Sequence, residues 1–424
     1  PSSMMRSLVC LLLLLSPSSP FAPLPLPRSK PPAPPAPLSA SSAPPSASSA
    51  APSAAAPSAA AVDTLVIGSG VTGSTLAFHL SRNHGRSVLL AERNAAVGGN
   101  CISSLVSVPG AGDFVFDQGP NSAQPTPAIM RTCYELGLND DIILADGSLP
   151  RFVYWRGDGA GRKPGDLHAL PTNLPGDLLT FQLLSWPGRL RAAAGAAGLI
   201  APPPEGKKES VADFVTRHLG KEAFERIIAP FCSGVYAGDP EKLCMSAGLK
   251  KIFRLEGLGE LGPGLVSGAL VRMREIGDER RENPPDPRWK TYEGGQLMSF
   301  KRGLQTLPDA VAKHLGEDKI RTAHTLVSLT KDASSDLFHA TFEVGDGKEE
   351  AVIKARTVAL TSPAPATARV LGGSGNLVPA AERLKEIYQP PVAAVVLAYP
   401  NHMFKEDLPG YTAGNPLRGF GILF

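Results

Sequence analysis

The sequence is poor in residues that build disulfide frameworks and metal centres. Its 424 residues include five cysteines, an odd number without any Cys-x-x-Cys spacing, so neither a disulfide scaffold nor a zinc site is indicated. The eight histidines are scattered, and no two share a helix face with a third ligand nearby. We therefore expect no metal, and the free cysteines fit a reducing compartment.

Acidic residues are absent before Asp63, and this absence separates a leader from the body of the chain. Arg6 and the apolar run Leu8–Leu15 are typical of a signal peptide, and the run is too short to span a bilayer. The Ser/Ala/Pro-rich stretch that follows cannot bury a core. We expect a bipartite leader, in which Phe21 is similar to the cleavage point of proteins sent to complex plastids. An ordinary secreted protein with a disordered N-terminus is the alternative.

The body of the chain also lacks a net charge. Arg6, Arg28 and Lys30 belong to the leader, so the remainder holds 39 basic residues against 39 acidic ones. A neutral body gives no electrostatic reason to expect nucleic acid as a partner. Its length predicts two or three domains.

A strand that leads into a glycine-rich loop is the most informative motif present. The apolar run 62–67 predicts a buried parallel strand, and a predicted helix at 74–81 follows the loop. In such a loop the glycines allow a tight turn, close approach of a pyrophosphate and close packing of the helix. The strand, loop and helix together predict a dinucleotide site. Its loop residues are Gly68, Ser69, Gly70, Val71, Thr72 and Gly73.

Glu92 and two glycines after it indicate which dinucleotide binds. A second predicted strand, 87–91, ends at Glu92, where a carboxylate can accept hydrogen bonds from ribose hydroxyls and would repel a 2′-phosphate. A solvated strand-end charge is the alternative for this residue. Gly98 and Gly99 follow, a feature of flavoproteins rather than of nicotinamide enzymes. We predict FAD, with Glu92 and Gly99 among its contacts.

A second turn follows the strand-like run 114–118. Its glycine and proline would bring backbone amides toward a ring system, although the pattern alone indicates only a turn. The residues predicted to lie beneath the flavin are Gly119, Pro120, Asn121 and Ser122.

Two longer stretches carry a family resemblance. Glu209–Val215 and Phe224–Pro240 are similar to the signature of plastid-type protoporphyrinogen oxidases, within the flavin amine oxidase superfamily. The resemblance extends over nearly all of residues 62–424. Shorter matches follow the same order, at 119–122, 150–154, 300–308 and 390–395.

The resemblance implies an oxidoreductase of haem and chlorophyll synthesis. Such enzymes oxidise protoporphyrinogen IX to protoporphyrin IX on FAD, and molecular oxygen accepts the electrons to give hydrogen peroxide. The cofactor carries this chemistry. The sequence shows no Ser/His/Asp or paired-carboxylate constellation, so we predict no catalytic side chain. The resemblance also implies a chloroplast location, a monotopic membrane association and a possible homodimer.

Further site residues are carried over from the resemblance. Leu326, in the strand-like run 325–329, aligns with a backbone contact to adenine, although an ordinary core leucine would look the same. The positions that align with the walls of a flat porphyrinogen slot are Gly234, Ala364, Val392 and Phe420.

One position departs from the related mitochondrial-type enzymes. Those enzymes hold a substrate propionate with an arginine in a Leu-Gly-Leu-Arg stretch, where this chain has Asn139. A guanidinium binds carboxylate bidentately, so Arg151 or Arg302 is a candidate replacement.

The resemblance implies an α/β fold: a Rossmann-like FAD domain of the p-hydroxybenzoate hydroxylase type, a mixed-sheet substrate domain and a helical membrane-associating domain. Along the chain, the predicted order is a signal peptide (1–20), a transit-like leader (21–61), a first FAD-domain segment (62–135), the helical domain (136–236), a first substrate-domain segment (237–295), a second FAD-domain segment (296–357) and a second substrate-domain segment (358–424).

Two surface features are also predicted. Residues 173–204 combine apolar side chains with Arg189 and Arg191, which is typical of a helix lying in a membrane interface, although a buried helix pair is the alternative. Residues 277–292 are polar and predict a surface loop.

Two competing functions remain open at this point. One is another flavin amine oxidase or a carotenoid desaturase, and the other is a binding protein that resembles GDP-dissociation inhibitors and holds no flavin. The resemblance also implies that family members continue past the position of Phe424 with a strand and helix that close the flavin site. We therefore expect the chain as printed to bind FAD weakly or not at all.

Overall fold

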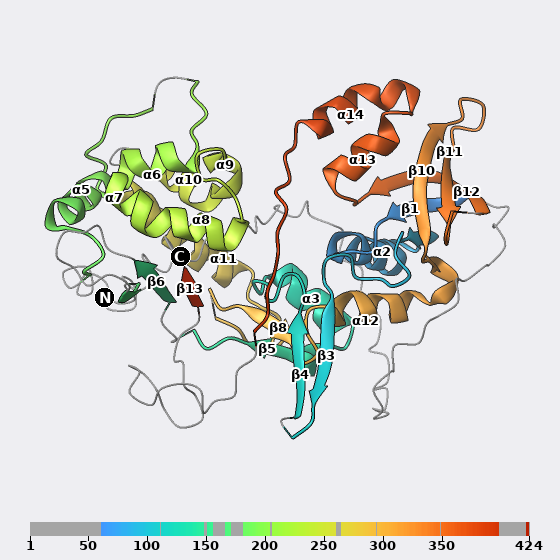
Figure 1. The fold of residues 1–424 in the computed structure, drawn as a ribbon, viewed down its shortest axis with the longest axis horizontal. Helices are drawn as coiled ribbons and strands as arrows, with labels where there is room; N and C mark the ends of the chain where they lie inside the picture. The colour runs from blue at the N-terminus through green and yellow to red at the C-terminus, as the bar shows by residue number, and fades with distance from the viewer. Residues whose placement is uncertain are drawn as a thin grey trace.

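The computed structural model describes residues 61–110, 112–147, 151–155, 166–170, 181–203, 206–259, 264–293, 295–347, 349–397 and 421–423. These residues form two lobes: a sheet lobe, on the right in Figure 1, and a helical lobe, on the left. The predicted leader lies outside the described residues, apart from Ala61.

A six-stranded sheet with the order β10-β11-β12-β1-β2-β9 forms the sheet lobe. Its centre is parallel, because β1 runs parallel to β12 and β2, and β2 runs parallel to β9. β11 is antiparallel to both of its neighbours. This mixed sheet confirms the predicted α/β fold class. The strands are β1 (Val62–Ile67), β2 (Val88–Ala91), β9 (Ile320–Arg321), β10 (His324–Lys331), β11 (Phe338–Val344) and β12 (Glu349–Leu360).

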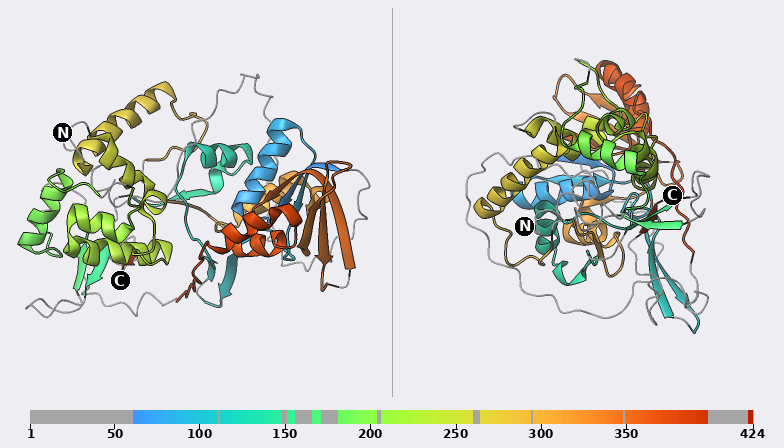
Figure 2. Two further views of the ribbon diagram at one scale, coloured as in Figure 1. Left: turned by 90° about the horizontal axis from the view of Figure 1, so that it is seen from above. Right: turned by 90° about the vertical axis from the view of Figure 1, so that its left-hand side faces the viewer.

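Helices cover both faces of this sheet (Figure 2). Val66 packs toward α2 and α12, whereas Leu65 and Ile67 pack toward α13 and α14. A strand buried on both faces has no solvated side, which explains the unbroken apolar run of β1. The four helices are α2 (Val71–His84), α12 (Thr306–Leu315), α13 (Ala364–Leu371) and α14 (Val378–Lys385).

The sheet lobe extends further along the chain than the predicted segments. The boundary predicted between 357 and 358 falls inside β12, and α13 and α14 pack on the same sheet. In the structure, residues 358–385 therefore lie with the six-stranded sheet rather than with a separate sheet.

The helical lobe surrounds its own apolar core. Val211, Phe214, Met245 and Leu249 are buried there, and α6 begins with a capping box between Ser210 and Asp213. A three-stranded sheet with the order β13-β6-β7 lies against this lobe. The elements are β6 (Arg151–Trp155), β7 (Asp166–Ala169), α5 (Trp186–Ala196), α6 (Val211–Leu219), α7 (Lys221–Ala223), η2 (Phe224–Ile228), α8 (Ala229–Tyr236), α9 (Met245–Gly248), α10 (Lys250–Leu258), α11 (Leu265–Glu282) and β13 (Gly421–Leu423).

The second stretch that carries the family resemblance, Phe224–Pro240, is helical as far as Tyr236 and contains one wide turn. η2 is a π-helical turn, in which Ala229 N–H donates to Phe224 O. Pro230 follows directly, and a proline lacks an N–H and clashes with the carbonyl four residues earlier. A wider turn relieves that clash, which explains the position of the π-helical turn.

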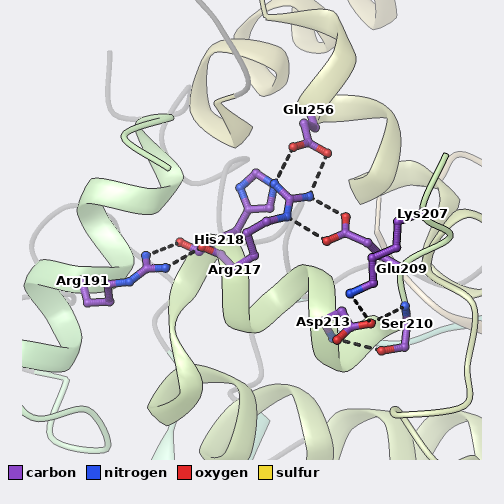
Figure 3. A network of polar contacts seen from close by, with 8 residues as sticks. All are labelled: Arg191, Lys207, Glu209, Ser210, Asp213, Arg217, His218 and Glu256. Carbon is purple, nitrogen blue, oxygen red and sulfur yellow. Dashed lines mark hydrogen bonds and ion pairs between the residues drawn. The ribbon is translucent and has the colours of Figure 1, made fainter. Parts of the chain in front are cut away.

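A cluster of charged side chains lies in the helical lobe, with Glu209 and His218 buried in it (Figure 3). Arg217 Nε donates to Glu209 Oε1 at 2.8 Å, and Arg217 Nη1 donates to Glu256 Oε1 at 2.7 Å. His218 is fully buried, with Nε2 3.2 Å from Glu256 Oε1. Arg191 donates to the carbonyls at the end of α6, including His218 O at 3.0 Å. The cluster thus ties α5, α6 and α10 together.

Smaller elements lie between or beside the two main bodies. The strands β3 and β4 form an antiparallel ribbon, and β5 pairs with β8. The elements are β3 (Ser103–Val108), β4 (Gly112–Asp117), α3 (Pro127–Glu135), η1 (Asn139–Asp141), β5 (Ile142–Leu144), β8 (Met298–Phe300), η3 (Glu317–Lys319) and η4 (Gly375–Leu377).

The surface loop predicted at 277–292 begins later than expected. α11 continues to Glu282, because Arg272 pairs with Glu275 and Glu279 one and two turns further along the same helix. The prediction was wrong for 277–282, where charged residues were taken as a sign of a loop.

Of the segment predicted to lie in a membrane interface, 173–180 and 204 lie outside the described residues, and 181–203 is only partly exposed. Phe181, Leu183 and Leu184 are buried in a core shared with β6, so the prediction was wrong for these three residues. Trp186 and Leu190 of α5 remain 61% and 67% exposed. Within the described ranges, no helix has both the length and the apolar character needed to cross a membrane.

Candidate functional site

The glycine loop joins β1 to α2 and is fixed by close backbone contacts. Gly68 lies at φ +98°, and its N–H donates to Ala91 O at 2.8 Å. A Cβ on Gly73 would lie 1.9 Å from Gly68 O, so the first turn of α2 packs directly on the loop. Only glycine fits there.

The N-terminus of α2 is open toward a ligand. Gly70 is its N-cap, no side chain caps the first turn, and no acidic residue lies within that turn. Val71 and Thr72 at the start of the helix are exposed. The first N–H groups of a helix lack internal partners and carry the positive end of the helix dipole, so this end fits a pyrophosphate.

Glu92 is buried beside this loop, with only 5% of its surface exposed. Its Oε2 accepts hydrogen bonds from Ser69 N–H at 2.8 Å and Ser69 Oγ at 2.7 Å, and its Oε1 accepts one from Asn94 N–H at 2.9 Å. Among the described residues no cation pairs with it. A buried carboxylate that has only neutral donors is suited to accept further hydroxyl donors, such as those of a ribose.

The Gly98-Gly99 pair closes over the loop. Gly98 N–H donates to Ser69 O at 3.2 Å, and a Cβ on Gly99 would lie 2.8 Å from Gly70 Cα. Both glycines have positive φ angles, +124° and +59°. The pair therefore allows two backbone segments to touch where side chains would hold them apart.

The turn predicted beneath the flavin adjoins the same cluster. Asn100 follows Gly99, and a Cβ on Gly119 would lie 2.2 Å from Asn100 O. Backbone contacts thus lead from Gly70 through Gly99 and Asn100 to Gly119. The other members of the turn are exposed or half-buried: Pro120, Asn121 and Ser122.

Leu326 lies on β10, the strand whose first residue contacts the backbone of Glu92. His324 N–H, at the start of β10, donates to Glu92 O at 2.8 Å. Leu326 is half-buried against the sheet core, and the pairing of β10 with β11 shifts register between Leu326 and Ser328. An adenine contact at this position stays a prediction.

The predicted porphyrinogen residues lie in different surroundings. Gly234 is exposed on α8, Ala364 is half-buried at the first turn of α13, and Val392 is 72% exposed. Phe420 lies outside the described residues, and β13, which follows it, packs beside α8. Convergence of these four positions stays a prediction.

Asn139 has a structural contact in place of the expected arginine. Its Nδ2 donates to Arg288 O at 2.8 Å and so braces the segment that leads from α11 to β8. Arg302 is exposed, and Arg151 begins β6 in the helical lobe. A propionate contact from either arginine stays a prediction.

Thr361 is a site residue that sequence reasoning missed. It follows the end of β12 and donates from Oγ1 to Ile67 O at 2.7 Å and to Gly68 O at 3.1 Å. The signal was its place after an apolar strand, because the carboxyl ends of neighbouring parallel strands meet at one edge. Its hydroxyl thus fixes the backbone carbonyls at the start of the glycine loop.

Reactive side chains are not concentrated near this loop. Burial raises the pKa of Cys133 to about 12 and that of Cys232 to about 11, so both thiols stay protonated at neutral pH. In the described ranges of the chain, no three His, Cys, Asp or Glu residues are grouped to hold a metal ion. A dinucleotide cofactor bound at this loop would supply redox chemistry that the protein's own side chains cannot.

A parallel strand, a glycine loop, an open helix N-terminus and a buried carboxylate define a dinucleotide-binding oxidoreductase. The model of the family "Flavin containing amine oxidoreductase" matches residues 71–423. The chain belongs to this family, and FAD is its cofactor.

The curated relatives sharpen this assignment. The chain is 39% identical over 363 residues to "Protoporphyrinogen oxidase, chloroplastic" of Oryza sativa subsp. japonica, which covers 85% of this chain and 63% of that protein. The relative of the same name from Nicotiana tabacum is 36% identical, with 86% and 61% covered. The predicted resemblance to plastid-type enzymes is confirmed, and the chain spans about three fifths of their length.

A solved structure supports the fold. The crystal structure of a candidate protoporphyrinogen oxidase from Exiguobacterium sp. 255-15 matches with a TM-score of 0.53 at 20% identity, covering 74% of this chain and 62% of that one. At this identity the likeness concerns the fold alone.

Proposed function

We propose that this chain belongs to an enzyme that oxidises protoporphyrinogen IX to protoporphyrin IX with molecular oxygen as acceptor. Six electrons and six protons leave the porphyrinogen, and three oxygen molecules take them up as three molecules of hydrogen peroxide. The observation that carries the proposal is the 35–39% identity to chloroplast protoporphyrinogen oxidases over about 85% of the chain.

The residues of the sheet lobe fit the separate groups of FAD. Amides at the start of α2 would hold the pyrophosphate, Glu92 would accept ribose hydroxyls, and the Gly119–Ser122 turn would lie beneath the ring. When bound, FAD supplies the hydride acceptor. The protein's own task is to orient the macrocycle and to exclude competing reactions. Gly234, Ala364, Val392 and Phe420 are the positions proposed for the slot.

Spectroscopy of the purified chain tests the function. We would record flavin absorbance, then follow porphyrin fluorescence after adding protoporphyrinogen IX, with a polyamine and a carotene precursor as competing substrates. The same assay would be run on a chimaera completed with the C-terminal remainder of the rice relative. Porphyrin formation by the yellow chimaera supports the proposal. A yellow chimaera that oxidises only the polyamine or the carotene precursor would identify a sister oxidase.

We also propose a plastid location, attachment to a membrane surface and assembly as a homodimer. The location is supported by the chloroplast relatives. Attachment is supported by α5, where Trp186 and Leu190 are exposed and the Arg189 guanidinium lies 5.1 Å from the Trp186 ring. Co-sedimentation with anionic vesicles should fall when both apolar residues are changed to Ser, and unchanged sedimentation would exclude this surface.

A further inference from the structure

A hydrogen-bonded clasp lies at the base of the β3-β4 ribbon, just before the turn assigned to the flavin ring. Asp117 Oδ1 accepts from Ser103 Oγ at 2.5 Å and from Leu304 N–H at 2.9 Å. Ser103 N–H donates to Gln305 Oε1 at 2.9 Å, and Gln305 N–H donates to Ser103 Oγ at 3.1 Å. One carboxylate and one hydroxyl thus join β3, β4 and the segment that leads into α12.

Gly303 allows these segments to approach. It lies at φ +82°, and a Cβ there would be 2.3 Å from Ser103 Oγ and 2.6 Å from Asp117 Oδ1. The clasp therefore needs a glycine as well as the two polar side chains, as expected of a specific arrangement rather than a chance surface contact.

The turn is fastened at its other end to the same distant segment. Ala123 N–H donates to Met298 O at 2.9 Å, and Met298 N–H donates to Ala123 O at 2.8 Å. Residues 118–122 are thus held between two anchors, Asp117 on one side and Ala123 on the other. Both anchors are hydrogen-bonded to the same segment, residues 298–305.

We propose that Asp117, with Ser103, is a positioning residue that holds the Gly119–Ser122 turn in place for the isoalloxazine end of FAD. The inference rests on the proposed cofactor site. A turn fixed before the cofactor arrives loses little conformational freedom on binding, so affinity is higher than for a loose turn. Asp117 would act through the position of the backbone, because its Oδ1 already accepts hydrogen bonds from Ser103 and Leu304.

The same ribbon supplies a matched control. Ser107 Oγ donates to Asp113 Oδ1 at 2.5 Å, and this pair faces across β3 and β4 as Ser103 and Asp117 do. The Asp113 pair lies at the exposed end of the ribbon, and in the described residues no hydrogen bond joins it to the 298–305 segment. Asp113→Asn removes the same kind of charge from the same ribbon without touching the clasp.

The test compares Asp117→Asn with Asp113→Asn in the full chain. Deuterium exchange of the peptide that covers 118–123 is measured without FAD, and the FAD dissociation constant and the visible circular dichroism of bound flavin are measured by titration. We expect Asp117→Asn to speed exchange in this peptide and to weaken FAD binding, each by roughly tenfold, with an altered flavin spectrum. Asp113→Asn should change none of these.

The possible failures are distinguishable. Equal exchange and equal FAD binding in the two variants would overturn the clasp. Faster exchange throughout the sheet lobe, with a normal flavin spectrum, would overturn it as well, because Asp117 would then act on stability alone. If the wild-type chain and the rice chimaera take up no FAD, the proposed function fails, while the exchange measurement still decides whether Asp117 holds the turn.

Discussion

Two buried carboxylates, one in each lobe, have different kinds of hydrogen-bond donor. Glu209 in the helical lobe is 8% exposed and receives two hydrogen bonds from the Arg217 guanidinium. Glu92 in the sheet lobe is 5% exposed, and its partners are the backbone and hydroxyl of Ser69 and the backbone of Asn94. One charge is neutralised within the protein, and the other is not.

This difference separates scaffold from binding site. Burial lowers the pKa of the Arg217 guanidinium, but hydrogen bonds to Glu209 and Glu256 outweigh it, so its pKa is raised and the guanidinium stays charged. Such a cluster stabilises one arrangement of helices. The carboxylate of Glu92 has no cationic partner among the described residues, so it can still accept hydrogen bonds from a polar ligand.

The largest effect is expected when the helical cluster loses its cation. Arg217→Met leaves two carboxylates in a buried site without a counter-charge, and we expect the free energy of unfolding to fall by about 3–5 kcal/mol. Urea denaturation followed by circular dichroism measures it. Arg288→Met is the control, because that guanidinium is 61% exposed and pairs with Asp286 at the surface. A loss for Arg217→Met as small as the control's would refute a desolvated cluster.

The two ends of α2 allow a second comparison. Gly73→Ala forces a Cβ against Gly68 O, and we expect a loss of about 1–3 kcal/mol in stability together with loss of FAD binding. Gly85→Ala meets no atom within 4 Å and suffers only from its left-handed φ of +59°, at about 1 kcal/mol. FAD titration and thermal unfolding measure both. Equal FAD affinity in the two variants would contradict the close-approach argument.

A smaller effect is expected from pH. Burial lowers the pKa of His218 below its ordinary 6.5, and Glu256 opposes this change while Arg217 reinforces it. In the window between the lowered pKa and 6.5 the unfolded chain binds more protons, so stability is full above that window and falls as the pH drops through it. A difference of one between the folded and unfolded pKa corresponds to about 1.4 kcal/mol of stability.

Thermal unfolding between pH 8 and pH 5 tests this prediction. His218→Gln should flatten the decline in Tm. Some decline should remain, because burial also lowers the pKa of His79 and His314 in the sheet lobe. An unchanged slope in the variant would remove His218 as the source.

The dinucleotide site was visible in the sequence where its signals are local. The strand, the glycine loop and Glu92 lie within about thirty residues, and each follows from strand or helix patterning. The contacts of Thr361 with Gly68 and of Asp117 with Leu304 join residues 293 and 187 positions apart. For Thr361 the only signal was its place after an apolar strand, and for the contact of Asp117 with Leu304 the sequence held none.

In the helical lobe, one wrong prediction had a local cause and the other a long-range cause. Arg and Glu in residues 277–282 were taken for a loop, but spacings of three and seven residues let Arg272 stabilise a helix. Phe181, Leu183 and Leu184 were assigned to a membrane face, and their burial depends on strands and helices that only the tertiary structure brings together.

The contrast between the two carboxylates is tested most directly by FAD titration and urea unfolding of Glu92→Gln beside Glu209→Gln. We predict that Glu92→Gln weakens FAD binding at least about tenfold and changes the free energy of unfolding by less than about 1 kcal/mol. Glu209→Gln should lower stability and leave FAD affinity unchanged. If Glu92→Gln instead destabilises the protein while FAD binds as tightly as before, Glu92 is scaffold and the site assignment is contradicted.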